Sequence, residues 1–174
     1  MKVLRVVLGV AIVGSGFVVV GAATAHNPDV IRPAKAGPIV REETTMAQLR
    51  DWFGPPTVRR PVTVACSRVT KARWGRRLQV YAWRDEARHV AAVFVRRRPL
   101  HSREHGDLTV HTARGLSVGD SERRLRRLYP RSRPQTHAGH THYRLRTGAY
   151  DAYLLAKVVD HEVVQLEIWP YEFC

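Results

Sequence analysis

The sequence predicts an α+β fold with two tandem repeats, each a short helical segment packed on an antiparallel β-sheet. Two observations lead to this prediction. A short amphipathic pattern that begins at a hydroxyl residue and ends at glycine or proline occurs twice, at 45–56 and at 121–130. After each copy, the apolar spacing changes from about 3.6 residues to about 2, which is the change from helix to strand.

The first helix is expected to begin at Thr45. Thr45 and Gln48 have the spacing of a capping box, in which each side chain binds a backbone amide of the first turn. The helix is expected to end at Gly54-Pro55-Pro56, because glycine and proline stop a helix. Its apolar face would consist of Met46, Leu49, Trp52 and Phe53.

The second helix is expected to begin at Ser121, which stands where Thr45 stands in the first copy. Leu125, Leu128 and Tyr129 take the apolar positions, and Pro130 follows them. The outer face would be strongly basic, either simply solvated or in contact with a polyanion, because it carries Arg123, Arg124, Arg126 and Arg127.

Strands are expected where apolar and polar residues alternate. They are Pro38–Arg41, Val62–Thr70, Arg77–Arg84, His89–Arg98, Thr141–Arg146, Ala152–Asp160 and Glu162–Trp169. The expected organisation is a signal peptide over 1–25, a linker and first strand over 26–43, the first repeat over 44–99, a connecting loop over 100–106, and the second repeat over 107–174.

Residues 1–25 have the features of a secretory signal peptide. Lys2 and Arg5 precede an apolar run, and Ala23 and Ala25 form a small-residue cleavage site before polar His26. We expect cleavage after Ala25, a secreted or extracytoplasmic location, and no membrane span after cleavage. The alternative is an uncleaved anchor, because the apolar run is about long enough to cross a bilayer.

The two cysteines, Cys66 and Cys174, are expected to form one disulfide bond. Both lie outside the signal peptide, and thiols that are exported together to an oxidising compartment usually pair. This bond would connect the last strand to the first repeat.

The duplicated pattern resembles the β-lactamase inhibitory protein family, whose tandem units each carry a short helical segment followed by an antiparallel sheet. More distantly, Thr45-Met46 and Gly54-Pro55-Pro56 resemble the helix of the small lipoproteins of outer-membrane assembly. The resemblance covers roughly residues 38–174 and implies a binding module whose sheet face meets another protein. The sequence departs from both families, because the inhibitors carry one disulfide in each repeat and the lipoproteins an acylated cysteine.

Two motifs suggest hydrolytic chemistry, but each has a simpler interpretation. HSREH at 101–105 fits the H-x-x-E-H pattern of zinc proteases, but Pro99 and Gly106 leave room for little more than one helical turn, so a loop is expected. Gly119-Asp120-Ser121 resembles the start of a serine hydrolase signature, but no Asp-x-x-His follows it. Ser121 is therefore interpreted as an N-cap, and no enzymatic activity is expected.

Three histidines, His137, His140 and His142, are the candidate metal ligands. Such a group could hold zinc or copper. No nearby Cys, Asp or Glu completes the set, so a solvated loop is the favoured interpretation and no cofactor is expected.

One face of each sheet is expected to remain uncovered by the helices. Along 77–84, Leu78, Val80 and Ala82 alternate with larger polar and aromatic side chains. An uncovered face rich in Tyr, Trp and Arg is typical of a protein interface. The candidate partner site is Arg77, Tyr81, Trp83, Tyr153 and Lys157. The alternative is that Trp83 and Trp169 close the seam between the repeats as core.

The sequence thus predicts a secreted, non-enzymatic binding protein, inhibitor-like in character, that binds an extracellular or envelope protein. The first alternative is a cationic envelope-associated protein that binds an anionic polymer or lipid, because Lys and Arg number 29 against 15 Asp and Glu. A metal-dependent or serine hydrolase is the third. Nucleic acid is not an expected partner, because the sequence has no nucleic-acid-binding motif.

Overall fold

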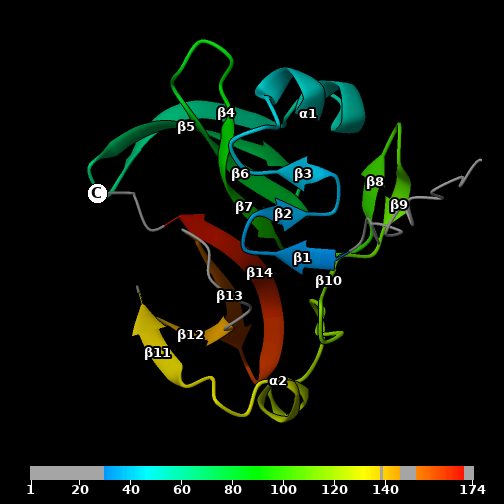
Figure 1. Cartoon of the computed structure of the whole chain (residues 1–174), viewed down its shortest axis with the longest axis vertical. Helices are drawn as coiled ribbons and strands as arrows, with labels where there is room; N and C mark the ends of the chain where they lie inside the picture. The colour runs from blue at the N-terminus through cyan, green and yellow to red at the C-terminus, as the bar shows by residue number, and fades with distance from the viewer. Residues whose placement is uncertain (1–29, 138, 146–151, 171–174) are drawn as a thin grey trace, which may run out of the picture.

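The structure is a computed structural model that describes residues 30–137, 139–145 and 152–170 (Figure 1). It contains two helices, α1 (Met46–Phe53) and α2 (Glu122–Leu128). The strands are β1 (Val30–Arg32), β2 (Lys35–Ala36), β3 (Ile39–Val40), β4 (Val58–Val64), β5 (Ser67–Trp74), β6 (Leu78–Trp83), β7 (Val90–Val95), β8 (Leu100–Ser102), β9 (Gly106–Leu108), β10 (His111–Thr112), β11 (Pro134–His137), β12 (His140–Leu145), β13 (Ala152–Val159) and β14 (Glu162–Pro170).

The expected α+β class with two helix-on-sheet repeats is wrong, because the chain is mostly β-sheet. The two helices have 8 and 7 residues. Strands from both halves of the chain form one 8-stranded antiparallel sheet in the order β11-β12-β13-β14-β7-β6-β5-β4. β14 and β7 pair at its centre, where Ile168 lies opposite Val93. Two separate sheets would leave unpaired backbone groups on these two strands, and their pairing satisfies those groups.

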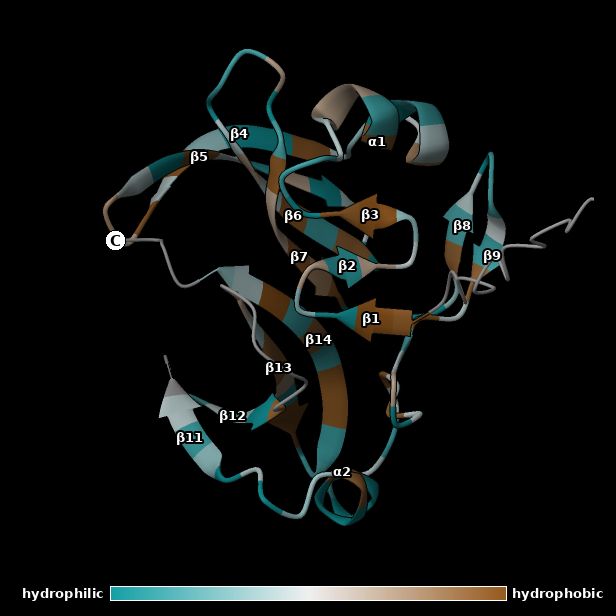
Figure 2. Cartoon of the chain, viewed as in Figure 1, coloured by the Kyte–Doolittle hydropathy of each residue, from teal (hydrophilic) through white to brown (hydrophobic). Residues whose placement is uncertain are grey.

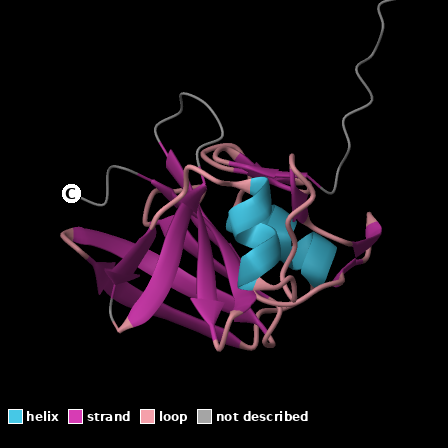
Figure 3. Cartoon of the chain, turned by 90° about the horizontal axis from the view of Figure 1, so that it is seen from below, coloured by secondary structure: helices cyan, strands magenta, loops and turns pink. Residues whose placement is uncertain are grey.

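Both helices lie on the same side of this large sheet (Figure 3). Each one inserts a fully buried leucine, Leu49 from α1 and Leu125 from α2, into a core that continues through both halves of the sheet. Burial of one leucine side chain stabilises the fold by about 2 kcal/mol. Along β14, apolar residues that face this core alternate with more polar ones (Figure 2).

A second, four-stranded sheet covers the same side, in the order β10-β1-β2-β3. Ile31, Ala36 and Ile39 from this sheet belong to the same buried cluster as Leu49 and Leu125. The segment 26–43 was expected to be a linker leading into a first strand at Pro38–Arg41; β3 lies in that strand, and β1 and β2 lie in the part expected to be a linker. The expected connecting loop, 100–106, carries β8 and the turn to β9.

The two predicted helix caps are confirmed. Thr45 accepts a hydrogen bond from the backbone amide of Gln48 (3.3 Å), and the Gln48 side chain accepts from the Thr45 amide in return (2.8 Å). The Ser121 hydroxyl accepts from the Arg124 amide (3.2 Å). Each cap also forms a β-bridge to the large sheet, Thr45 to His89 and Ser121 to Glu162, so the start of each helix is fixed next to a central strand.

The single strand expected over 62–70 is wrong, because this segment turns back on itself. β4 and β5 form a hairpin in which Val64 lies opposite Ser67. Ala65 adopts a left-handed backbone conformation (φ 51°) in the turn. Glycine, asparagine or aspartate usually fill such a position, so the sequence carries no recognisable turn signal here.

In the described part of the chain, no helix has the length and apolar character to cross a membrane.

Candidate functional site

The side of the large sheet that faces away from the helices is the candidate site, and we call it the open face. No helix of the described residues covers it (Figure 3). Its centre is a second cluster of buried residues, Val69, Ala91, Ala92 and Phe94, which is separate from the main core. Half-buried aromatic side chains, among them Tyr81, Trp83 and Trp169, pack against this cluster.

Three rings from β6, β7 and β14 form an aromatic cluster on the open face: Tyr81, Phe94 and Trp169. Ring centroids are 5.1 Å apart for Tyr81 and Phe94, 5.4 Å for Phe94 and Trp169, and 6.1 Å for Tyr81 and Trp169. All three pairs meet edge to face, the favoured geometry for aromatic contacts. The cluster spans the pairing of β7 with β14, so the two halves of the sheet build it together.

Beside the aromatic cluster lies a hollow of about 310 Å³ over β11 to β14, here called the aromatic hollow. The Arg144 guanidinium carbon lies 3.5 Å from the centroid of the Tyr153 ring, a cation–π contact. Tyr153 lies opposite Trp169 in the β13–β14 register. The residues that line this hollow are Gln135, His142, Arg144, Tyr153, Leu155, Glu167 and Trp169.

One carboxylate in the aromatic hollow is held by two neighbours. His142 Nε2 lies 3.4 Å from Glu167 Oε1, and the two side chains are 12% and 8% exposed. The side-chain amide nitrogen of Gln165, Nε2, donates to the same oxygen at 2.6 Å. The hydrogen bond to Glu167 raises the pKa of His142 above its ordinary value. The imidazole of His142 therefore keeps its positive charge to a higher pH than an ordinary histidine does.

A second hollow, of about 480 Å³, lies at the end of β7 and is strongly basic. Its cationic residues, which define the basic hollow, are Arg73, Arg76, Arg96, Arg97 and Lys157. Burial and the nearby Arg73 guanidinium lower the pKa of Arg96. Burial also lowers the pKa of Lys157, and Arg96 adds to this shift. The cations therefore repel one another in a partly desolvated place.

Three of the five predicted partner-site residues lie within these features. Tyr81 belongs to the aromatic cluster, Tyr153 to the aromatic hollow and Lys157 to the basic hollow. Trp83 is half-buried against the Val69 cluster, and its indole nitrogen donates to Glu42 Oε2 at 2.9 Å.

Arg77 lies apart from the other four predicted residues, because it is in the turn before β6 instead of on the strand. Its guanidinium donates to the carbonyl oxygen of Pro99 at 3.4 Å. Neither the aromatic hollow nor the basic hollow is lined by Arg77.

Sequence reasoning missed Phe94, Arg96 and Arg144 as open-face residues. Phe94 lies in the continuous apolar run 90–95, where alternation cannot distinguish the two faces. Arg96 follows the last residue of β7, and its place beside Lys157 depends on the pairing of β7 with β14. For the second half of the large sheet, the sequence did carry a signal for the open face. Gln165, Glu167 and Trp169 alternate with apolar residues along β14.

The HSREH segment forms a hairpin instead of a helix, with β8 and β9 as its arms. His101 contacts the Asp107 side chain across the hairpin, and the His105 ring lies 5.2 Å from the Trp52 ring. The two histidines therefore do not share a helix face, the arrangement that the zinc-protease pattern requires.

The candidate metal ligands lie in and near the β11–β12 hairpin. His137 and His140 are opposite each other in its register, and His142 faces Glu167 in the aromatic hollow. Among the side chains that the structure describes, no group of three His, Cys, Asp or Glu is close enough to hold a metal ion.

Cys66 lies in the turn between β4 and β5 and does not carry a free thiol. Cys174 lies outside the described residues, so the pairing of these two cysteines stays a prediction. The expected signal peptide, residues 1–25, also lies outside the described part of the chain.

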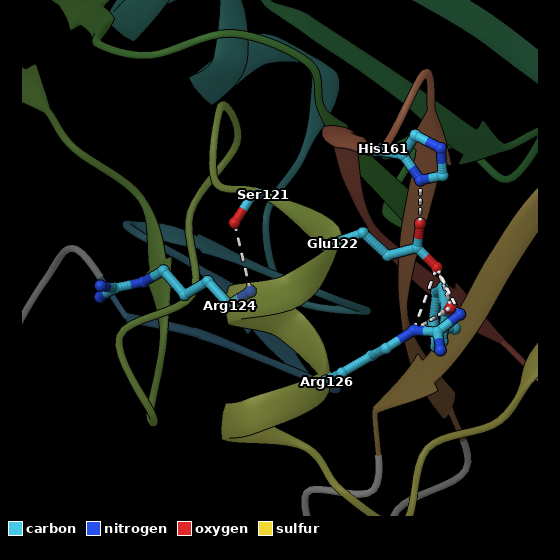
Figure 4. Close-up of polar contacts among 6 residues, drawn as sticks. Ser121, Glu122, Arg124, Arg126 and His161 are labelled. Atoms are coloured by element: carbon cyan, nitrogen blue, oxygen red, sulfur yellow. Dashed lines mark hydrogen bonds and ion pairs between the residues drawn. The ribbon is translucent and has the colours of Figure 1, made fainter.

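A polar cluster around Glu122 fixes α2 to the sheet (Figure 4). Glu122 accepts hydrogen bonds from the Tyr143 hydroxyl and from Arg126 (2.8 Å), and its other oxygen lies 2.9 Å from His161 Nδ1. The contacts with Tyr143 and His161 lower the pKa of Glu122 from 4.5 to about 2. These partners come from α2, β12 and the β13–β14 turn, so the cluster is a structural connection on the side of the helices.

No family model matches the chain, and no curated protein matches its sequence. Among solved structures, it is similar to an extracellular protein from Bacillus anthracis strain Ames that contains an SCP domain. The identity is 10% and the TM-score 0.41, over 71% of this chain and 42% of the other. This chain therefore spans less than half the length of that protein. A likeness at this level identifies neither a family nor an activity.

Proposed function

We propose that the protein is exported and acts as a non-enzymatic binding protein whose open face binds an extracellular or envelope protein. The observation that supports this proposal is the aromatic cluster on the face that no described helix covers: its Trp169 lines the aromatic hollow, and its Tyr81 lies near Arg96 of the basic hollow. Tyr81 and Trp169 are half-buried, so part of each side chain is exposed to solvent. Tyr, Trp and Arg are the residue types that dominate the binding energy of protein interfaces.

The proposal favours binding over hydrolysis because the candidate nucleophile and zinc ligands have structural roles. The Ser121 hydroxyl caps α2, and the His101 and His105 side chains belong to the β8–β9 hairpin. Inhibition of a partner by this face is the finer form of the proposal, in line with the resemblance noted in the sequence.

A second candidate is binding of an anionic polymer or lipid through α2. The helix carries four arginines, and the protein has a formal net charge of +14. Two of the four arginines already pair with acids, since Arg124 lies 3.2 Å from Asp120 and Arg126 lies 2.8 Å from Glu122. Arg123 and Arg127 are exposed and would make the contact. This reduced charge makes α2 the weaker of the two surfaces.

The test is capture from culture medium and envelope fractions with three forms of the exported protein as bait. They are the wild type, the open-face variant Tyr81→Ala/Trp169→Ala, and the α2 variant Arg123→Ala/Arg127→Ala. A captured protein that is retained at high salt, lost with the open-face variant and kept with the α2 variant supports the proposal. Loss with the α2 variant alone, or release by salt, supports the second candidate, since screening weakens polyanion contacts. Melting curves check that each variant is folded.

A further inference from the structure

The geometry points to a carboxylate as the ligand of the basic hollow, so we infer that the partner contributes an aspartate or glutamate beside an apolar side chain. The inference rests on the proposed function, because it names what the partner presents to the open face. It is carried by three observations: the charges in the hollow, one buried donor without a partner among the described residues, and the position of the aromatic cluster.

The charges in the basic hollow are almost all of one sign. Arg73 from β5, Arg96 after β7 and Lys157 from β13 meet there, and Glu162 is the one acid among the lining residues. Lys71, nearby on β5, also has a lowered pKa, because of burial and the positive charges of Arg60, Arg73 and Arg96. The fold thus holds several cations together against their repulsion, and a bound anion would relieve it.

One buried donor on the open face, Nε of Arg96, has no hydrogen-bond partner among the described residues. Gln79 Oε1, in a residue that is 3% exposed, also lacks a partner there, but it is an acceptor and cannot pair with a carboxylate. Gln79 lies opposite Arg73 on one side and Phe94 on the other. A buried donor that stays unpaired costs about 1–3 kcal/mol. A carboxylate that binds the Arg96 guanidinium can accept from Nε once this side chain rotates, since the nitrogen is itself buried. Carboxylates commonly bind a guanidinium through two parallel hydrogen bonds, and such a pair would remove the cost.

Among the described residues, the acids near the basic hollow do not neutralise it. Glu167 is the acid that raises the pKa of Arg96, but its side chain is 8% exposed and is held by His142 and Gln165. Glu162 is exposed at the start of β14 and forms a backbone bridge to Ser121. The described residues of the hollow therefore have an excess of positive charge that an incoming acid can meet.

The neighbouring aromatic cluster indicates a protein segment as the source of the carboxylate. Gln79 pairs with Phe94, and Tyr81 follows on the same face of β6 two residues later. A ligand whose acid contacts Arg96 would place its adjoining atoms over Tyr81 and Trp169. An apolar side chain next to the acid gains from this contact, whereas a polyphosphate has no apolar group for it.

The experiment is selection of a random phage-displayed peptide library on the full exported protein. We expect enriched peptides with an acidic residue next to an aromatic or aliphatic one. Their affinity should fall at least about tenfold for Arg96→Gln and for Arg73→Glu, because each change leaves the peptide's acid without its partner. Arg123→Gln on α2 is the matched control and should bind as the wild type does. Replacement of the peptide's acid by lysine should restore binding to Arg73→Glu.

The other outcomes separate this inference from the proposed function. Two results would overturn the carboxylate inference and leave the open face as a binding site. In the first, the peptides lose binding with Tyr81→Ala but contain no acid. In the second, they bind both Arg73→Glu and Arg96→Gln as well as the wild type. Peptides that bind equally well to all open-face variants would contradict both. Polyphosphate that competes for the hollow as well as the best peptide does would assign the site to a polymer and overturn the inference. Urea unfolding checks that each variant is folded.

Discussion

The rings of Tyr81 and Trp169 lie 6.1 Å apart, although they come from opposite halves of the large sheet. Between them runs β7, and the centroid of its Phe94 ring lies 5.1 Å from that of Tyr81 and 5.4 Å from that of Trp169. The expected alternatives for the tryptophans were a partner surface or the seam between the two halves. Trp169 packs at the junction of β14 with β7, which is the seam, and its side chain is only half-buried; its part in a partner surface stays a prediction.

Tyr81 and Trp169 are predicted to stabilise each other. In a double-mutant cycle with Tyr81→Leu and Trp169→Leu, the two losses in unfolding free energy should differ from additivity by about 0.5–1.5 kcal/mol, as for other aromatic pairs. Urea unfolding of the four proteins measures this coupling. A cycle of Tyr81→Leu with Trp52→Leu is the control, because α1 lies on the other side of the sheet. Additive losses for the first pair would show that the ring contact contributes nothing.

Stability should depend on pH near neutrality through His142. The contact with Glu167 raises the pKa of this imidazole above 6.5, so its stabilising contribution is fully present below pH 6.5 and is lost as the pH rises through the raised value. NMR titration of the ring should show the raised pKa, and Glu167→Gln should lower it toward the ordinary value. His140, which is exposed on the same strand, is the control. A His142 pKa that Glu167→Gln leaves unchanged would contradict this assignment.

Local chemistry was the predictable part of the fold. Thr45 and Ser121 cap their helices as the sequence indicated, because a hydroxyl before an amphipathic run binds amides within its own first turn. The strands expected at 152–160 and 162–169 agree with β13 and β14 to within one residue at each end, because a short turn and regular alternation bound them.

Contacts between distant segments could not be predicted in the same way. The pairing of β7 with β14 makes one sheet of the two halves, and no local pattern encodes which strand edges will meet. The same pairing creates the basic hollow, because it brings Arg96 near Lys157. The turn at Ala65 was hidden for another reason, since a left-handed alanine looks like any strand residue in the sequence.

Export is predicted to remove residues 1–25, with cleavage between Ala25 and His26, because a small-residue site follows the apolar run. N-terminal sequencing of the protein recovered from outside the cytoplasm should therefore begin at His26. The variant Ala25→Arg should block cleavage, while Ala22→Ser, at a position outside the cleavage site, should not. Recovery of the chain with Met1 intact in a membrane fraction would instead support the uncleaved anchor.

A single disulfide between Cys66 and Cys174 is predicted in the exported protein. Intact mass should increase by two hydrogens on reduction, as expected for one bond. The chain-entropy estimate for a loop of this size is a stabilisation of about 4–5 kcal/mol, which should appear as a lower urea midpoint for Cys66→Ser/Cys174→Ser. Alkylation of both thiols in the denatured, unreduced protein would rule out the bond.

Glu122 is predicted to make the protein sensitive to acid. Its pKa falls from 4.5 to about 2, chiefly through the hydrogen bonds with Tyr143 and His161. A carboxylate with a lowered pKa contributes stability above its unfolded value, and this contribution is lost as the pH falls from about 4.5 through about 2. At neutral pH, Glu122→Gln should cost about 1–2 kcal/mol, since it weakens charge-assisted hydrogen bonds that are partly open to solvent.

Urea unfolding at a series of pH values tests the role of Glu122. The gap in stability between the wild type and Glu122→Gln should narrow between pH 4.5 and 2, because the wild-type carboxylate then becomes neutral as well. Glu43→Gln is the matched control, since Glu43 is exposed, and it should be as stable as the wild type throughout. A gap that stays constant down to the lowest pH would mean that Glu122 acts through packing, and its charge would then have no part in fixing α2 to the sheet.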